Sequence, residues 1–223
     1  MTCIRAWSLA AMLTATLGCT VSQAGAFLGV PSEPHSEATT VRAAQDESML
    51  HNDAGGRLFE QGHLEGAARE FREAIRLRPR NPTPHNNLGM ILHVLGQPAD
   101  ALAEFREAVT LNPDYASAWS NLGFVFFELA QLAPAMETWR IALDINNQMA
   151  GTWAGLALGL FAGGHVNPAI ESYRQAIHLD PRYADLIYLQ TVRHWSARAL
   201  DHADTILKVI AARQQASLHG SLI

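Results

Sequence analysis

Histidine and cysteine side chains are the first place to look for chemistry, because they most often bind metals or act as nucleophiles. The chain has ten His and two Cys among its 223 residues. It contains no His-Glu-x-x-His motif and no close pair of His facing one way on a helix, which helical zinc sites need. No glycine-rich phosphate loop occurs either, since Gly163-Gly164 has the pattern of a helix-end turn. The sequence therefore predicts a protein that is not an enzyme, without metal, cofactor or small-molecule substrate.

Residues 1–26 have the pattern of an export signal. Arg5 provides a positive start, Ala6–Leu17 is an uncharged and mostly apolar run, and Ala24-Gly25-Ala26 offers the small residues that a signal peptidase requires. The apolar run is too short for a comfortable membrane span. These features predict export with cleavage after Ala26, and a location in the periplasm or cell envelope.

Both cysteines, Cys3 and Cys19, lie in this segment, so the predicted mature domain contains no thiol and no disulfide. The stretch Leu17-Gly18-Cys19 resembles the lipobox of bacterial lipoproteins, although Thr16 stands where that family usually has Leu. This resemblance implies an alternative, in which cleavage precedes Cys19 and that cysteine is lipidated. An uncleaved signal that anchors the chain to a membrane is a third alternative.

The balance of charge argues against nucleic acid as a partner. The chain has 16 Lys and Arg against 21 Asp and Glu, a net charge of −5, whereas phosphate binding needs a basic face. Residues 27–47 include Pro31 and Pro34 and show little apolar patterning. They are predicted to be a flexible linker between the export signal and the folded part.

From Ser48 the sequence repeats with a period of 34 residues. The period divides residues 48–183 into four units, 48–81, 82–115, 116–149 and 150–183. Five positions of each unit carry residues of one kind. In unit order these are position 15 (Gly62, Gly96, Ala130, Gly164), position 20 (Ala67, Ala101, Ala135, Ala169), position 24 (Phe71, Phe105, Trp139, Tyr173), position 27 (Ala74, Ala108, Ala142, Ala176) and position 32 (Pro79, Pro113, Asn147, Pro181).

Each of these positions has a physical reason in a pair of antiparallel helices. Alanine at positions 20 and 27 lets the two helices approach closely, and the aromatic side chain between them fills the remaining gap. Glycine at position 15 can adopt the left-handed conformation that ends the first helix. Proline at position 32 ends the second helix. The pattern predicts an all-α fold built from four helical hairpins.

These residues resemble the tetratricopeptide repeat, a family of 34-residue helix–turn–helix units. The family's first-helix signature of Trp, Leu, Gly and Tyr at positions 4, 7, 8 and 11 is largely present, in unit three as Trp119, Leu122, Gly123 and Phe126. The resemblance implies a right-handed α-solenoid whose first helices line a concave groove. In the family such grooves bind proteins, so the resemblance also implies a protein or peptide partner.

A stack of such units needs an end that tolerates water. The 34-residue pattern decays after Arg182, and residues 184–223 are predicted to form a capping pair of helices, over 185–199 and 202–213, with a frayed tail from Gln214.

The resemblance implies which side chains face the groove. The predicted partner-binding residues are Asn87, Met90, His93, Ser117, Asn121, Phe124, Phe127, Leu158 and Phe161. Asn87 and Asn121 both occupy position 6, where an amide can pair with the backbone of any extended peptide. This arrangement resembles the asparagine ladder of O-GlcNAc transferases. The alternative is that both amides only bind water.

The family's carboxylate clamp, which grips the C-termini of heat-shock chaperones, needs Lys or Arg at positions 2 and 6 of particular units. None of the four units has a basic residue at either position. A co-chaperone of that type is therefore excluded.

Four of the predicted groove residues, Phe124, Phe127, Leu158 and Phe161, form what we call the phenylalanine patch. An exposed apolar patch can receive an amphipathic helix. Alternatively, the capping helices cover it, or it is buried in a homo-oligomer.

Together these features predict a non-catalytic scaffold or adaptor of the bacterial cell envelope that assists complex assembly. It is expected to bind an extended peptide or amphipathic helix in its concave groove. A lipid-anchored assembly factor and a structural homo-oligomeric subunit are the two alternatives.

Overall fold

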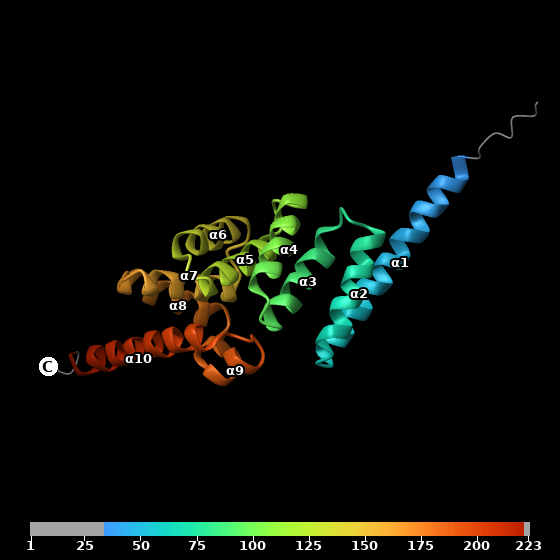
Figure 1. Cartoon of the computed structure of the whole chain (residues 1–223). Helices are drawn as coiled ribbons and strands as arrows, with labels where there is room; N and C mark the ends of the chain where they lie inside the picture. The colour runs from blue at the N-terminus through green and yellow to red at the C-terminus, as the bar shows by residue number, and fades with distance from the viewer. Residues whose placement is uncertain (1–33, 221–223) are drawn as a thin grey trace, which may run out of the picture.

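The computed structural model describes residues 34–220 and the side chains of residues 39–217, and this part of the chain is helical and contains no strand. Helices pair into hairpins that stack side by side into a curved rod (Figure 1). The hairpins are α1 (Pro34–Glu60) with α2 (Leu64–Leu77), α3 (Pro82–Val94) with α4 (Pro98–Leu111), α5 (Ala116–Glu128) with α6 (Leu132–Ile145), and α7 (Ala150–Ala162) with α8 (Val166–Leu179). The predicted all-α solenoid of four units is confirmed.

The helix starts follow the 34-residue register, with one exception. Helices α3, α5 and α7 begin at Pro82, Ala116 and Ala150, the first residues of their predicted units. Helix α1 begins at Pro34, fourteen residues before Ser48, and its first turns project beyond α2 (Figure 1). The prediction of a flexible linker over 27–47 is therefore wrong for residues 34–47. The absence of apolar patterning there reflects a solvated helix, since its described side chains up to Glu47 are exposed or half-buried.

The turn inside each hairpin is made by the residue at position 15. Gly62, Gly96 and Gly164 have φ angles of 78°, 73° and 81°. Ala130 takes the same left-handed conformation at φ 59°, although its Cβ atom makes that conformation costly. Position 15 therefore takes the left-handed conformation at the end of the first helix, as the sequence predicted.

Close packing inside each hairpin explains the small residues at further positions of the repeat. The alanines at positions 20 and 27 have no exposed surface in any unit. At position 8 of unit three, a Cβ atom added to Gly123 would lie only 2.5 Å from Nε1 of Trp139. The Trp139 ring also reaches the next unit, where a Cβ atom on Gly155 would lie 2.6 Å from it. Gly155 therefore makes room for an indole that is larger than the phenylalanine rings of units one and two.

The C-terminal region differs from the predicted cap in its boundaries. A short 3₁₀ helix, η1 (Pro181–Ala184), and α9 (Leu186–Thr191) follow unit four, and after an irregular segment α10 runs from Ala197 to Gly220. Helix α10 packs against α7 and α8 (Figure 1). The cap is thus confirmed as helical, but the tail predicted to fray from Gln214 continues as helix to Gly220.

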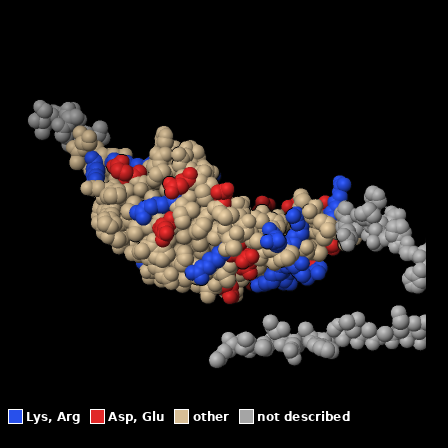
Figure 2. All heavy atoms as spheres, turned by 90° about the horizontal axis from the view of Figure 1, so that it is seen from above, with Lys and Arg blue, Asp and Glu red and all other residues tan. Residues whose placement is uncertain are grey.

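The charged side chains lie mixed over the surface. Figure 2 shows acidic and basic residues interspersed on one face, with basic ones gathering toward the α1–α2 end. Several belong to short-range pairs, such as Arg76 with Glu73 at 2.6 Å and Arg174 with Glu171 at 3.1 Å. Among the described residues, no helix is both long enough and apolar enough to cross a membrane.

Candidate functional site

The first helix of each unit is fixed to the preceding unit by a ring at position 4. Nε1 of Trp119 donates to the carbonyl of Pro113, and Nε1 of Trp153 donates to the carbonyl of Asn147, both at 2.8 Å. His85 takes the place of the tryptophan in unit two, with its Nε2 2.9 Å from the carbonyl oxygen of Pro79. Because a carbonyl can only accept, this nitrogen of His85 carries the proton.

The second ring nitrogen of His85 lies 2.7 Å from a carboxylate oxygen of Glu104 in the same unit. Burial lowers the pKa of His85, but the bonds to Glu104 and to the Pro79 carbonyl, with the charges of Glu104 and Glu107, outweigh it. The pKa of His85 is therefore raised. When protonated, His85 donates to both neighbours at once and ties unit two to unit one.

The concave side carries a chain of hydrogen-bonded amides. Nδ2 of Asn121 donates to Oδ1 of Asn86 at 3.0 Å, and Nδ2 of Asn87 donates to Oδ1 of Asn52 at 3.0 Å. Nδ2 of Asn86 donates to Oδ1 of Asn87 at 3.3 Å and joins the two bonds. We call these four residues the amide chain. Sequence reasoning missed the pairing, although position 5 of units one and two also holds Asn.

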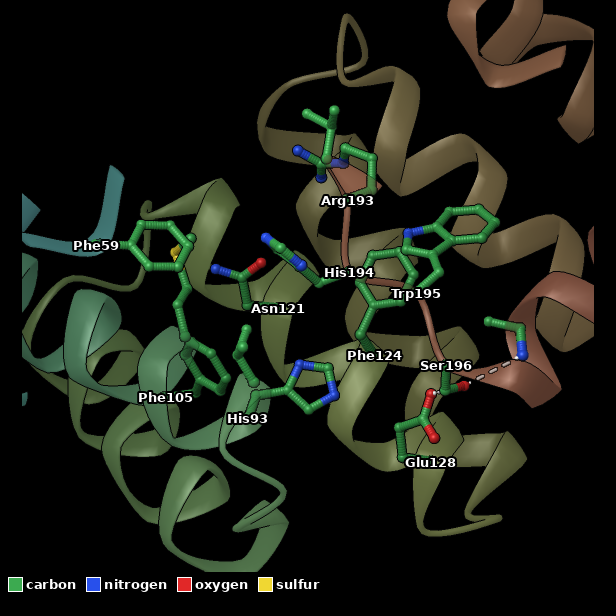
Figure 3. Close-up of a pocket in the computed structure, with 14 residues that line it drawn as sticks. Phe59, His93, Phe105, Asn121, Phe124, Glu128, Arg193, His194, Trp195 and Ser196 are labelled. Atoms are coloured by element: carbon green, nitrogen blue, oxygen red, sulfur yellow. Dashed lines mark hydrogen bonds between the residues drawn. The ribbon is translucent and has the colours of Figure 1, made fainter. Parts of the chain in front are cut away.

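A first hollow lies where α1, α3 and α5 meet the segment after α9. It encloses about 210 Å³, and we call it the Phe59 hollow; it is lined by Phe59, Met90, His93, Asn121, Phe124 and Trp195, among others (Figure 3). Four of the predicted groove residues meet here. Phe59 and the segment 192–196 were not predicted as groove residues. Phe59 occupies position 12 of unit one, which is equivalent to the predicted His93 and Phe127, so the repeat register could have found it. The segment 192–196 lies outside the repeats.

His93 is one of the titratable groups that line this hollow, with Glu128, Arg193 and His194. Burial lowers the pKa of its imidazole, and the charge of Glu128 only partly opposes this effect. The His93 ring is therefore neutral at pH 7, and the hollow has both apolar and polar lining residues.

A second hollow adjoins the first and shares Met90, Asn121 and Arg193 with it. It encloses about 490 Å³, and we call it the Tyr183 hollow; it is lined by Ser117, Asn121, Gly151, Tyr183, Tyr188 and Arg193, among others. Three of the predicted groove residues line this hollow. Met90 and Asn121 also line the first hollow, whereas Ser117 lines only the second. Together the two hollows form one continuous depression on the concave side.

The phenylalanine patch is not an open surface. Phe127 and Leu158 have no exposed surface. The Phe124 ring lies 5.7 Å from the Trp195 ring, and the Phe127 and Phe161 rings each meet His202 of α10 edge-on. The prediction that Phe127 and Leu158 contact a partner is therefore wrong for this conformation. Of the three alternatives, the structure shows the patch covered by the chain's own C-terminal region.

Polar bonds hold that cover in place. Oγ of Ser196 donates to a carboxylate oxygen of Glu128 at 2.5 Å, and Arg198 donates to the carbonyl of Phe127 at 3.0 Å. The Arg198 guanidinium also lies 4.7 Å from the centre of the Phe127 ring. A homo-oligomer built on the phenylalanine patch would first have to displace these contacts. Among the predicted sites, Cys19 lies outside the described residues.

Comparison with known proteins agrees with this architecture. A family model for the tetratricopeptide repeat matches residues 52–116 and 94–150. No curated protein matches the sequence. Among solved structures, MamA (residues 41 to the end) from Desulfovibrio magneticus RS-1 superimposes with a TM-score of 0.56 at 22% identity, covering 76% of this chain and 97% of that one.

Two further structures cover 54% of this chain at 22% identity. The first repeat domain of Spaghetti (RPAP3), bound to the HSP90 peptide SRMEEVD, has a TM-score of 0.53 and is covered over 95% of its length. The corresponding domain of Sgt2 from Aspergillus fumigatus has a TM-score of 0.52 and is covered over 82%. These likenesses concern the fold, which in this family is that of a protein-interaction scaffold. The 34-residue units, their hairpin geometry and the matching family model agree that this chain contains tetratricopeptide repeats.

Proposed function

We propose that this protein is a non-catalytic scaffold that binds an extended peptide or an amphipathic helix on its concave side. The observation that carries the proposal is the continuous depression formed by the Phe59 and Tyr183 hollows. Residues from all four units line it. Because the depression runs across several units, it can contact several residues of a partner, as a peptide-binding groove must.

The chemistry of the depression suits a peptide. Phe59, Met90 and Phe124 offer apolar contact, whereas Asn121 offers an amide whose oxygen accepts no hydrogen bond from the described residues. A peptide backbone needs both a surface for its side chains and partners for its polar groups. The ring and amide bonds between units fix the lining before a partner arrives, so less ordering opposes binding.

We expect a partner different from the peptide that the Spaghetti domain binds. The Spaghetti domain is described as bound to an HSP90 peptide. This chain has no Lys or Arg at positions 2 and 6 of its four units, so we propose a peptide of another kind.

We further propose that the protein works in the bacterial cell envelope. The support is the export pattern of residues 1–26, which lie outside the described residues. A lipid-anchored assembly factor, held by Cys19, is the second form of this proposal. It is supported by Leu17-Gly18-Cys19 and by the 14 residues between Cys19 and the start of α1 at Pro34, which would separate the repeats from a membrane.

Affinity capture from cells, with one substitution inside the depression and one outside, tests the groove. Met90→Glu places a charge between the two hollows, whereas Ala99→Glu changes an exposed residue on α4. We expect Met90→Glu to abolish capture of the proteins that the parent and Ala99→Glu both retain, at unchanged helicity by circular dichroism. Equal capture by all three forms would show that partners bind elsewhere.

A further inference from the structure

Two helix starts face the Tyr183 hollow without a capping side chain. Helices α5 and α7 begin beside it, and their N-cap residues, Tyr115 and Met149, make no side-chain bond to the first turn. The N–H groups of Ser117 and Gly151 have no acceptor among the residues that the structure describes. Unpaired N–H groups and the positive end of the helix dipole both favour a negative charge at this place.

The hydroxyl group of an otherwise buried tyrosine points to a ligand at the same place. Tyr183 is only 3% exposed, yet its hydroxyl makes no hydrogen bond with any described residue, although the hydroxyl lines the Tyr183 hollow. It lies 2.7 Å from the position that a Cβ atom on Gly151 would take. Burial raises the pKa of this hydroxyl, so it stays protonated and available as a donor. Because no described side-chain polar atom is both buried and unpaired, this hydroxyl reaches the hollow, where it is free to donate to a group outside the chain.

A guanidinium group completes the arrangement. Nη2 of Arg193 lies 3.1 Å from the same point beside Gly151, so the guanidinium, the hydroxyl and the start of α7 converge. Arg193 forms no ion pair with a described residue. The carboxylate that also lines the hollow, Asp180, is paired with Arg182 at 2.9 Å. The bond from Arg182 and, to a smaller extent, the charge of Arg193 lower the pKa of Asp180. A side chain at position 151 would collide with the hydroxyl, so glycine is what lets these groups come so close to the start of α7.

We propose that the Tyr183 hollow is an oxyanion-binding site, in which Arg193, the Tyr183 hydroxyl and the starts of α5 and α7 hold a carboxylate or phosphate group. This inference rests on the proposed function, and it adds the chemistry that the bound partner must carry. The positive charge of the site is the Arg193 guanidinium, which belongs to the segment after α9 and not to the repeats. Because the hollow is far larger than a bare ion, the group belongs to a larger molecule, such as an acidic residue or the end of a peptide.

The test uses the purified, ¹⁵N-labelled chain and two probes, inorganic phosphate and N-acetylglycine, titrated at constant ionic strength. Both probes should cause saturable amide shifts at Ser117 and Gly151. Charge-assisted hydrogen bonds contribute about 1.5–3 kcal/mol, so Arg193→Gln should weaken binding about tenfold or more. The tighter probe identifies phosphate or carboxylate as the natural group.

Tyr183→Phe is the sharper variant, because it removes a hydroxyl that supports no bond within the protein. It should leave the melting temperature unchanged and still weaken both probes several-fold. Arg213→Gln, which alters an exposed arginine bonded to Asn167, is the matched control and should bind like the parent. The proposal is overturned if neither probe gives saturable shifts, or if Tyr183→Phe binds as the parent does. Should partner capture still depend on Met90 in that case, the proposed function stands without the oxyanion site.

Discussion

Asn121 donates its carboxamide N–H to Oδ1 of Asn86 at 3.0 Å, and one unit earlier Asn87 makes the same bond to Asn52 at the same distance. The bond between Asn86 and Asn87 joins the two pairs. The asparagines at position 6 therefore support the superhelix before they meet any partner. Hydrogen bonds in such a chain polarise and strengthen one another.

Asn87→Ala should destabilise the protein by about 1–2 kcal/mol, because it leaves the amides of Asn52 and Asn86 without their partner. Urea unfolding followed by circular dichroism measures the change. Combining it with Asn52→Ala gives a double-mutant cycle, in which we expect the two effects to be coupled by about 1 kcal/mol. Strictly additive effects would show that the bond contributes nothing.

Ala130→Gly should stabilise the protein by about 1 kcal/mol, because Ala130 holds a left-handed conformation that glycine adopts without strain. The mirror experiment is Gly96→Ala at the equivalent turn of unit two, which should destabilise by a similar amount. Thermal unfolding compares the two variants with the parent. Changes of the same sign at both positions would contradict the assigned conformations.

Stability should depend on pH through His85. Its folded pKa lies above the ordinary value of about 6.5, so the protonated ring contributes stability that is complete at acidic pH and is lost as pH rises through the folded pKa. His85→Trp should remove this dependence and keep the bond to the Pro79 carbonyl, as Trp119 and Trp153 do. The pH dependence is measured as the change of the urea unfolding midpoint between pH 5 and pH 8. If the midpoint of His85→Trp changes with pH as much as that of the parent, His85 is not the origin.

Trp195→Ala should cost about 3 kcal/mol and uncover the phenylalanine patch, because Trp195 is only 8% exposed and packs on Phe124 and Tyr183. Binding of the dye ANS should rise as the patch opens. Ile187→Ala is the control, since Ile187 is 69% exposed and its loss should matter little. Equal dye binding by the two variants would mean that the cover is held by other contacts.

Radiolabelled palmitate distinguishes the two forms of the envelope proposal. If the chain is lipidated, the label should enter the parent protein in bacterial cells and be absent from Cys19→Ser. If cleavage follows Ala26 instead, neither form should be labelled, and the exported product should begin at Phe27 by N-terminal sequencing.

The repeat was readable from sequence because each of its determinants is local. An alanine lets a neighbouring helix approach in every unit, and a glycine ends the first helix in three of the four, so the same signals recur at a fixed spacing. Trp139 shows the limit of this reasoning. Its indole extends into the next unit and leaves no room for a side chain on Gly155. Only the packed structure shows this contact.

The site was predicted in part, for a different reason. Met90, His93 and Asn121 lie in the depression because the repeat fixes which positions face inward. Phe127 and Leu158 satisfy the same rule, yet both are fully buried, and Phe127 is covered by a C-terminal region that follows no period. Where Trp195 and Arg193 would lie depends on how residues 185–197 turn back over the stack, and no local pattern encodes that path.

The ring-to-carbonyl bonds of Trp119 and Trp153 set the angle at which one hairpin meets the next. In a solenoid each unit contacts chiefly its neighbours, so a small rotation at one junction is carried by all that follow, as in a jointed arm. We therefore expect a substitution of Trp119 or Trp153 to change the spacing between the Phe59 and Tyr183 hollows, although neither indole lines them.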